Sequence, residues 1–388
     1  MYVRAYFFMG GGVVPNFFGL GVTAGSFAER VAMVSPSVGL LFYQSDTDEF
    51  LKFCVDDDGV SRWMQAELRP ARNLLINGSM GVWQRGSSVN AGGSGISTYA
   101  QDRWCFGNNS ASAYNMSRVT NVPSSRFLYS GRLTANVASP AALNGWEQFV
   151  EQRNMLFARG KYVTLSFWIR GSKSFSGACY VDTGTTADQM PGNGNAFTGG
   201  VTLVSQTVNI TTSWQKVVFT SSVVVPTNAN VLRVGLPKPS FVQNDWYEVT
   251  GVQFEIGTAH SEFEFLPYER ELMSCMRYYE NSTSGVNAPS ANWLENAFGH
   301  TQPFNGSYCF INANFKVTKR RLPDCVNHSY NGSANAFSNW NDGNNYAIGS
   351  VSCQRFSAGG IGILYNSANN FNTGSAVWHG WVANAELT

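Results

Sequence analysis

The side chains best suited to chemistry in this sequence are aromatic rings and amides gathered towards its C-terminal end. An exposed tryptophan or tyrosine ring can stack on the apolar C–H face of a sugar, and neighbouring amides and carboxylates can hydrogen-bond its hydroxyls. The richest stretch is residues 337–346, FSNWNDGNNY. The predicted carbohydrate-binding residues are Trp293, Trp340, Asn341, Asp342, Asn344, Tyr346 and Tyr365. A purely structural role for these aromatics is the alternative.

Motifs for catalysis or metal binding are not evident in the sequence. The four histidines are isolated, and no zinc-protease motif, nucleophile elbow or phosphate-binding loop occurs in its required context. Two carboxylate pairs could serve glycoside hydrolysis in principle, Glu147 with Glu151 and Glu262 with Glu264. They lie among bulky residues typical of helix faces and strand edges. We therefore predict no enzymatic activity, no cofactor and no metal site.

Charge and cysteine content exclude several classes of partner. The net charge is +1, from 26 basic and 25 acidic residues, so no broad field attracts nucleic acid. The only basic run, residues 316–321, is predicted to be a solvated strand end. No apolar stretch approaches the roughly 18 residues of a membrane span, so no membrane insertion is expected. Seven scattered cysteines without a metal-binding spacing predict reduced, mostly buried thiols in a protein folded in a cytoplasm.

Composition and periodicity predict an all-β protein. Charged residues make up only 13% of the chain, while there are 39 glycines and 14% aromatics, which suits short strands joined by tight turns. Apolar and polar residues alternate in several short runs, such as 162–168, 215–220 and 231–236. Strands do not alternate with helices, which excludes a parallel α/β sheet. We predict a two-sheet sandwich over residues 73–270.

Three smaller segments flank this sandwich. Residues 1–72 contain strand and turn patterns but few hydrophobic residues, so they form a small β module that would bury more surface by intertwining around a threefold axis. The aspartates at 46, 48, 56 and 57 are interpreted as turn residues because they lack calcium-loop spacing. Residues 271–280 form a short helical connector. Residues 281–388 form a small β tip domain rather than a disordered tail.

Several motifs together resemble one known family. Residues 73–86, NLLINGSMGVWQRG, form an apolar run, an Asn-Gly turn and a tryptophan-bearing run that are predicted as two strands. The further motifs are Asp102-Arg103-Trp104, residues 160–170 (GKYVTLSFWIR), 252–257 (VQFEIG), 268–272 (YEREL), 275–279 (CMRYY) and a closing 383–387 (ANAEL). This set resembles bacteriophage tail-fibre or receptor-binding proteins with a jelly-roll domain similar to carbohydrate-binding modules.

The resemblance implies a function as well as a fold. It implies a non-enzymatic homotrimeric tail-fibre subunit of the virion, attached to other tail or virion proteins through residues 1–72 and binding a host-surface glycan through the tip. It also implies that Trp83, Trp104, Trp168 and Trp246 are core or sheet-covering aromatics. Asn77 and Glu248 approximate the place of a structural calcium in such jelly rolls, although no metal is predicted. The alternatives are a purely structural capsid decoration or tail spacer, and a glycan-cleaving spike.

Overall fold

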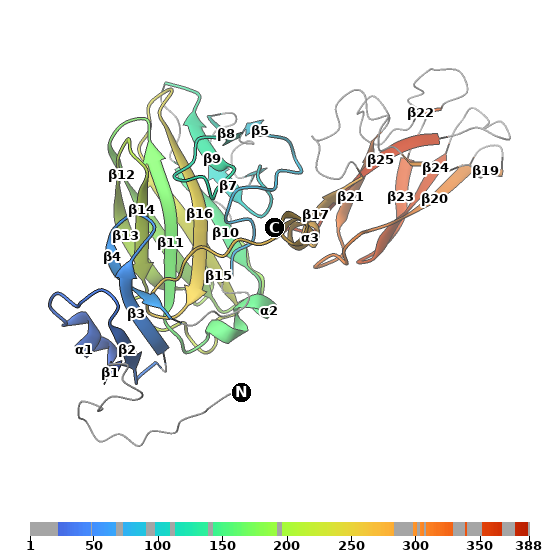
Figure 1. Ribbon diagram of the computed structural model, residues 1–388. Helices are drawn as coiled ribbons and strands as arrows, with labels where there is room; N and C mark the ends of the chain where they lie inside the picture. Colours follow the sequence, from blue (N-terminus) through green and yellow to red (C-terminus); the bar gives the residue numbers. More distant parts are fainter. Residues whose placement is uncertain are drawn as a thin grey trace.

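The computed structural model is nearly all β, which confirms the predicted fold class. It describes residues 22–47, 49–66, 73–90, 98–108, 113–138, 143–191, 196–282, 298–300, 303–305, 308–328, 338–339, 351–366 and 377–386. A small N-terminal sheet packs against one end of a central sandwich, and two further sheets follow a short helix (Figure 1). No helix of the described ranges is long and apolar enough to span a membrane.

The N-terminal unit is a four-stranded sheet with one short helix. Its elements are β1 (Val22–Gly25), α1 (Phe27–Val31), β2 (Leu41–Gln44), β3 (Glu49–Val55) and β4 (Ser61–Gln65), with β1 parallel to β2 and the other pairs antiparallel. Helix α1 begins where it does because Ser26 and Glu29 form a reciprocal capping box.

This N-terminal sheet is held on the sandwich by buried polar contacts. The Asp56 carboxylate, in the turn after β3, receives hydrogen bonds from Lys216 Nζ at 2.8 Å and lies 2.7 Å from His260 Nε2. Asp57 shares the same lysine at 2.8 Å. Asp56 and Asp57 are therefore turn residues, as predicted, that also dock the unit. The structure contains one chain, and the intertwined homotrimer stays a prediction.

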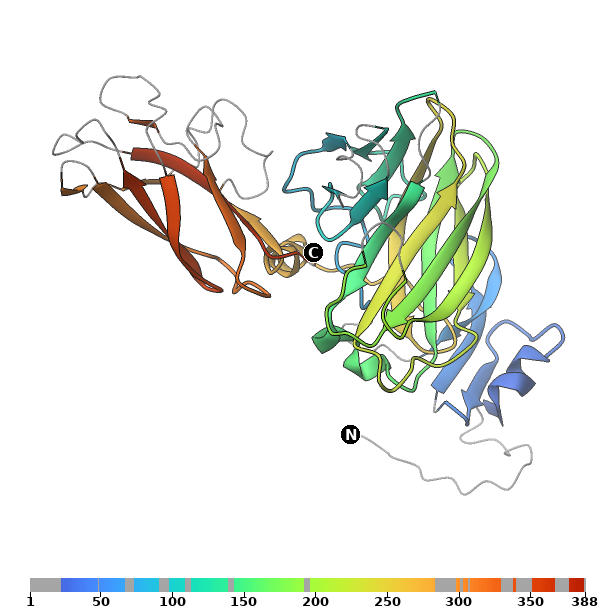
Figure 2. The ribbon, with the colours of Figure 1, turned by 180° about the vertical axis from the view of Figure 1, so that it is seen from behind.

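The central domain consists of two six-stranded antiparallel sheets packed face to face, seen from both sides in Figures 1 and 2. One sheet has the order β13-β12-β15-β10-β7-β6, and the other β14-β11-β16-β9-β8-β5. The pairs β12–β13, β11–β14, β10–β15 and β9–β16 nest around the β12–β13 hairpin and alternate between the sheets, which is jelly-roll topology. The elements are β5 (Ser88–Asn90), β6 (Thr98–Tyr99), β7 (Cys105–Asn108), β8 (Tyr114–Val119), β9 (Ser130–Ala135), β10 (Leu143–Val150), α2 (Gln152–Met155), η1 (Leu156–Ala158), β11 (Val163–Gly171), β12 (Phe175–Gly184), β13 (Val201–Ile210), β14 (Gln215–Thr220), β15 (Val231–Pro239) and β16 (Trp246–Ile256).

The core lies between these two sheets and is rich in large rings. Trp104, Trp146 and Tyr247 are fully buried there, and the first two pack edge to face with ring centroids 6.5 Å apart. Trp83 and Trp168 are also buried, as predicted for sheet-covering aromatics. The inside–outside alternation of the strands, interrupted by bulges such as the one at residues 166–168 of β11, leaves their other side chains on two outer faces.

The motif at residues 73–86 does not form the two predicted strands; the first strand of the sandwich begins at Ser88. The Asn77 side chain bonds backbone groups that strand pairing would otherwise satisfy. Its amide donates to the carbonyls of Val82 and Asp102 and accepts from the Val82 N–H. Gly78 lies so close to the Val252 carbonyl that a Cβ there would be 2.1 Å from its oxygen. The motif is a buried, tightly hydrogen-bonded turn.

The C-terminal part begins with α3 (Tyr268–Met276), so the helix starts earlier than the predicted 271–280 connector and ends sooner. Tyr279 and Glu280 belong to a strand because they pair with the last strand of the chain. The remaining elements are β17 (Tyr279–Asn281), β18 (Phe298–His300), β19 (Pro303–Asn305), β20 (Tyr308–Asn314), β21 (Asp324–His328), β22 (Ser338–Asn339), β23 (Val351–Ser357), β24 (Gly360–Asn366) and β25 (Val377–Asn384). They form the order β17-β25-β18, with β21 and β22 also pairing β25, and the sheet β19-β20-β24-β23.

The basic run at 316–321 is not a solvated strand end throughout. Lys319 is buried, and its ammonium group donates to Glu280 Oε2 at 2.5 Å and to the carbonyls of Met276 and Val317. Burial lowers the pKa of Lys319, and the Glu280 carboxylate opposes that shift. Arg320 Nη1 donates to Asp188 Oδ2 of the sandwich at 2.9 Å. These cations hold the C-terminal part in place.

Candidate functional site

Most of the predicted binding residues lie outside the part of the chain that the structure describes. These are Trp293, Trp340, Asn341, Asp342, Asn344 and Tyr346. The remaining one, Tyr365, belongs to β24, with Cys309 of β20 and Val351 of β23 as its neighbours in register. A sugar-binding loop at 337–346 therefore stays a prediction.

Among the described residues, a cluster of arginine and tryptophan side chains lies on the outer face of the β14-β11-β16-β9-β8-β5 sheet. Strands β11, β16 and β9 are adjacent there (Figure 1). Register places Glu248 of β16 between Arg170 of β11 and Arg132 of β9. Alternation along β16 turns Trp246 and Glu248 outward, whereas Tyr247 and Val249 are fully buried in the core. Three strands distant in sequence therefore converge on one surface, called the Trp246 face below.

Hydrogen bonds fix the charged groups of the Trp246 face. Arg132 Nε donates to Glu248 Oε1 at 2.8 Å, and Arg170 Nε donates to Glu248 Oε2 at 2.6 Å. The Glu248 carboxylate is fully buried, while the Arg132 and Arg170 side chains are 32% and 20% exposed. The carboxylate thus lies beneath the two guanidinium groups and orients both of them.

Two indole rings flank these guanidinium groups. The Cζ atoms of Arg132 and Arg170 lie 4.5 and 5.2 Å from the centroid of the half-buried Trp246 ring. Arg170 Cζ is also 5.5 Å from the Trp214 ring, whose Nε1 donates to Asn121 Oδ1 at 2.9 Å. Cation–π contacts of this kind hold side chains in fixed orientations. The result is an aromatic surface in contact with N–H donors, a combination suited to the apolar face and hydroxyl rim of a sugar.

Sequence reasoning missed this cluster because it treated Trp246 only as a sheet-covering aromatic. The alternation Trp246-Tyr247-Glu248-Val249 indicates that the Trp246 and Glu248 side chains share one face of the strand. Nothing in the sequence pairs Glu248 with arginines that lie 78 and 116 residues away. The idea of a calcium near Asn77 and Glu248 does not fit, because Glu248 binds two arginines and Asn77 binds backbone groups.

The outer face of the opposite sheet carries a second polar cluster that is satisfied internally. The Tyr180 ring lies over Gly235, where a Cβ would be 2.2 Å from its Cζ, and its hydroxyl donates to Glu147. Burial raises the pKa of Glu147, and Arg233 opposes that shift. Arg233 Nη2 in turn donates to Asp182 at 2.6 Å. These groups bond one another rather than pointing donors into solvent.

The carboxylate pairs considered for hydrolysis are engaged separately. Glu147 bonds Tyr180, and Glu151 accepts from Arg277 Nη2 at 3.0 Å. Glu264 accepts from the Asn73 N–H at 3.0 Å, and the exposed Glu262 carboxylate lies 3.6 Å from Arg126 Nη2. Across the described ranges, no group of three or more histidine, cysteine, aspartate or glutamate side chains is placed to hold a metal ion.

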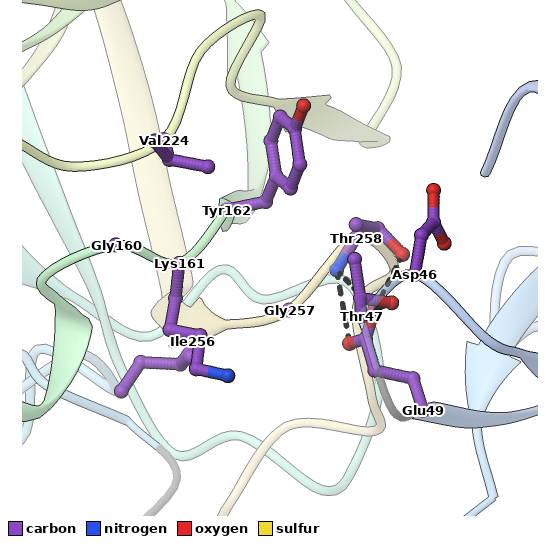
Figure 3. Close-up of a pocket in the computed structure, with 10 residues that line it drawn as sticks. All are labelled: Asp46, Thr47, Glu49, Gly160, Lys161, Tyr162, Val224, Ile256, Gly257 and Thr258. Atoms are coloured by element: carbon purple, nitrogen blue, oxygen red, sulfur yellow. Dashed lines mark hydrogen bonds between the residues drawn. The ribbon is translucent and has the colours of Figure 1, made fainter. Parts of the chain in front are cut away.

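A cavity of about 280 Å³ lies where the N-terminal sheet meets the sandwich (Figure 3). Asp46, Thr47 and Glu49 line it from the N-terminal side, and Tyr162 and Thr258 are among the sandwich residues opposite. The Glu49 carboxylate accepts hydrogen bonds from the Thr258 N–H at 3.1 Å, its hydroxyl at 2.8 Å and the Thr47 hydroxyl at 2.7 Å. The Glu49 carboxylate, one of the polar groups that line the cavity, thus joins the N-terminal sheet to the sandwich.

No protein-family model and no curated protein matches the sequence. Solved structures with a similar fold include the enzymatically active domain of tailspike protein 4 of bacteriophage CBA120, at 15% identity and a TM-score of 0.29, over 49% of this chain and 22% of that one. The C-terminal family 22 carbohydrate-binding module of Clostridium thermocellum Xyn10B matches at 13% identity and a TM-score of 0.27, over 40% and 87%. TmCBM61 in complex with β-1,4-galactotriose matches at 16% identity and a TM-score of 0.27, over 48% and 99%. These values are too low to support a functional assignment, which must come from the chain's own residues.

Proposed function

We propose that this chain is a non-enzymatic attachment protein that holds a surface glycan on the Trp246 face of its jelly roll. The observation that carries the proposal is the Trp246 ring in contact with two partly exposed guanidinium groups. Ring faces and directional N–H donors are the groups that a sugar requires. Pre-oriented side chains also lose little conformational freedom on binding.

We further propose that the chain works as a homotrimeric tail-fibre subunit of a phage virion. The motifs at residues 73–86 and 102–104 support this setting through their resemblance to tail-fibre proteins. In a trimer, three modest sites acting together gain effective affinity, so each site needs only a shallow surface. Attachment through residues 1–72 and a second sugar-binding surface at the tip belong to the same proposal.

The proposed lack of enzymatic activity is supported by the state of the carboxylates. A glycosidase needs two carboxyl groups facing one scissile bond. Glu147, Glu151, Glu248 and Glu264 each bond a tyrosine, arginine or backbone group of the protein. Release of reducing ends from a bound polysaccharide would favour a glycan-cleaving spike instead.

Affinity electrophoresis of the purified full chain through gels containing individual polysaccharides tests the proposal. Retention by at least one polysaccharide is expected, and Trp246→Ala should weaken it by about 2 kcal/mol, or roughly thirtyfold in Kd. Phe157→Ala is the matched control, because this aromatic is 79% exposed in η1, away from the Trp246 face. Two results would overturn the proposal: no retention by any polysaccharide, or retention that Trp246→Ala leaves intact. Loss of retention only in Trp340→Ala would move the site to the tip.

A further inference from the structure

The charges on the Trp246 face do not balance. Arg132 and Arg170 are both bonded to the single carboxylate of Glu248. The nearby Lys173 is neutralised separately, because its Nζ lies 2.9 Å from Asp245 Oδ2. Two guanidinium groups therefore share one negative charge, so Arg132, Arg170 and Glu248 together carry one excess positive charge. In a chain whose total charge is only +1, this local excess is a distinct chemical feature.

Glu248 uses only part of the donor set of these two arginines. Arg132 uses Nε and Nη2 on the carboxylate, and Arg170 uses Nε. Within the described part of the chain, no ion pair or hydrogen bond occupies Arg132 Nη1 or the two Nη atoms of Arg170. Both side chains reach solvent, whereas Glu248 is fully buried. A guanidinium edge of this kind matches a carboxylate in a bidentate arrangement.

The neighbouring tryptophans indicate which kind of ligand would bring a carboxylate to these arginines. Trp246 lies beside both arginines, and Trp214 lies beside Arg170. A sugar ring stacked on either indole would place a carboxylate substituent within reach of the open guanidinium edges. Nucleic acid is a poorer fit, because its affinity depends on several phosphate contacts along a basic stripe. Only one excess charge is present here.

We infer that the Trp246 face selects acidic glycans, binding a sugar carboxylate at Arg132 and Arg170 while the ring of that sugar or its neighbour stacks on Trp246. This inference rests on the proposed function, since it names the ligand class of the same site. The sugar carboxylate can come from a uronic acid or from a sialic-type acid. Neutral glycans lack the group that the excess charge attracts.

Biolayer interferometry with immobilised polysaccharides tests the selectivity on the full chain. Polygalacturonic acid supplies uronic acids, colominic acid supplies sialic acids, and dextran is the neutral comparison. We expect binding to one or both acidic polymers, weakened as salt rises, and at least tenfold weaker binding to dextran. Arg170→Gln should weaken acid binding about tenfold, because a charge-assisted hydrogen bond is lost. Arg170→Lys should restore part of it.

The control is Lys238→Gln on the opposite sheet, where the ammonium group lies 4.1 Å from the Tyr180 ring centroid. This variant also removes a cation beside an aromatic ring, but away from the Trp246 face, and should leave binding to the acidic polymers unchanged. Circular dichroism and thermal melts of each variant confirm folding. Binding to dextran that Trp246→Ala abolishes but salt and Arg170→Gln do not affect would keep the proposed function and overturn the acidic selectivity. Binding to none of the three polymers would overturn the acidic selectivity, while retention by another polysaccharide in affinity electrophoresis would keep the proposed function. Tighter, Arg170-dependent binding to duplex DNA would also overturn the inference.

Discussion

Replacing Glu386 with Gln should weaken the junction between the C-terminal part and the sandwich. This carboxylate is fully buried and pairs with Arg103, and its other oxygen lies 3.2 Å from Arg85 Nη2. In the variant, the neutral amide can still accept a hydrogen bond from one arginine, but Arg103 loses its charged partner and keeps its hydrogen bond to the Phe149 carbonyl at 2.7 Å and its contact with the Tyr278 ring at 3.5 Å. A buried cation that loses its partner costs about 3–5 kcal/mol. We therefore expect a loss of about 3 kcal/mol in the stability of this junction.

Hydrogen exchange followed by mass spectrometry measures that loss where it occurs. A loss of about 3 kcal/mol corresponds to roughly hundredfold faster exchange in β17 and β25, if these strands open together. The matched control is Asp324→Asn, which removes an exposed ion pair with Arg321 in the same part of the chain and should change stability by less than about 1 kcal/mol. Exchange within about threefold of the wild type in Glu386→Gln, or equal effects of the two variants, would refute the reasoning.

Two further predictions concern buried groups of the sandwich. Burial raises the pKa of Asp102 to about 6, above its unfolded value of 3.8, so the contribution of this group to stability is full at low pH and is lost as pH rises from about 4 to 6. Thermal melts at pH 4.5 and 7.5 should show the wild type losing stability relative to Asp102→Asn over this range, and an unchanged difference would contradict the assignment. Gly235→Ala should cost about 1–3 kcal/mol because its Cβ meets the Tyr180 ring, and Tyr180→Ala in the same chain should recover part of the loss in urea titrations. Additive losses would exclude this clash as the cause.

The strands of the sandwich could be predicted because each carries its own alternating pattern. Residues 162–168 alternate between apolar and polar side chains, and most of them lie in β11. A large ring such as Trp104 has no favourable place except a core. Jelly-roll topology came from the resemblance to tail-fibre proteins, since periodicity does not determine which strands pair. The pairing of β9 with β16 joins segments more than a hundred residues apart.

Two of the errors share one physical cause, which is that polar side chains found partners distant in sequence. Asn77 satisfied backbone groups that a strand would otherwise have paired, so residues 73–86 became a turn. Lys319 was predicted to be solvated, but Glu280 and two carbonyls compensate for its burial. The same limit applies to the Trp246 face, because Arg132, Arg170 and Glu248 belong to three separate strands.

The near-zero net charge of the chain determines how the Trp246 face would work. At physiological ionic strength, exposed charges are screened beyond about 8 Å, so a glycan responds to the charges of this face rather than to those of the whole protein. With a total charge of +1, the molecule has no long-range field to accelerate encounter. Discrimination must then come from contacts made after encounter, where the Glu248 carboxylate keeps both arginines oriented. A single such contact is weak, and firm attachment would require several copies acting on one polymer, as in the proposed trimer.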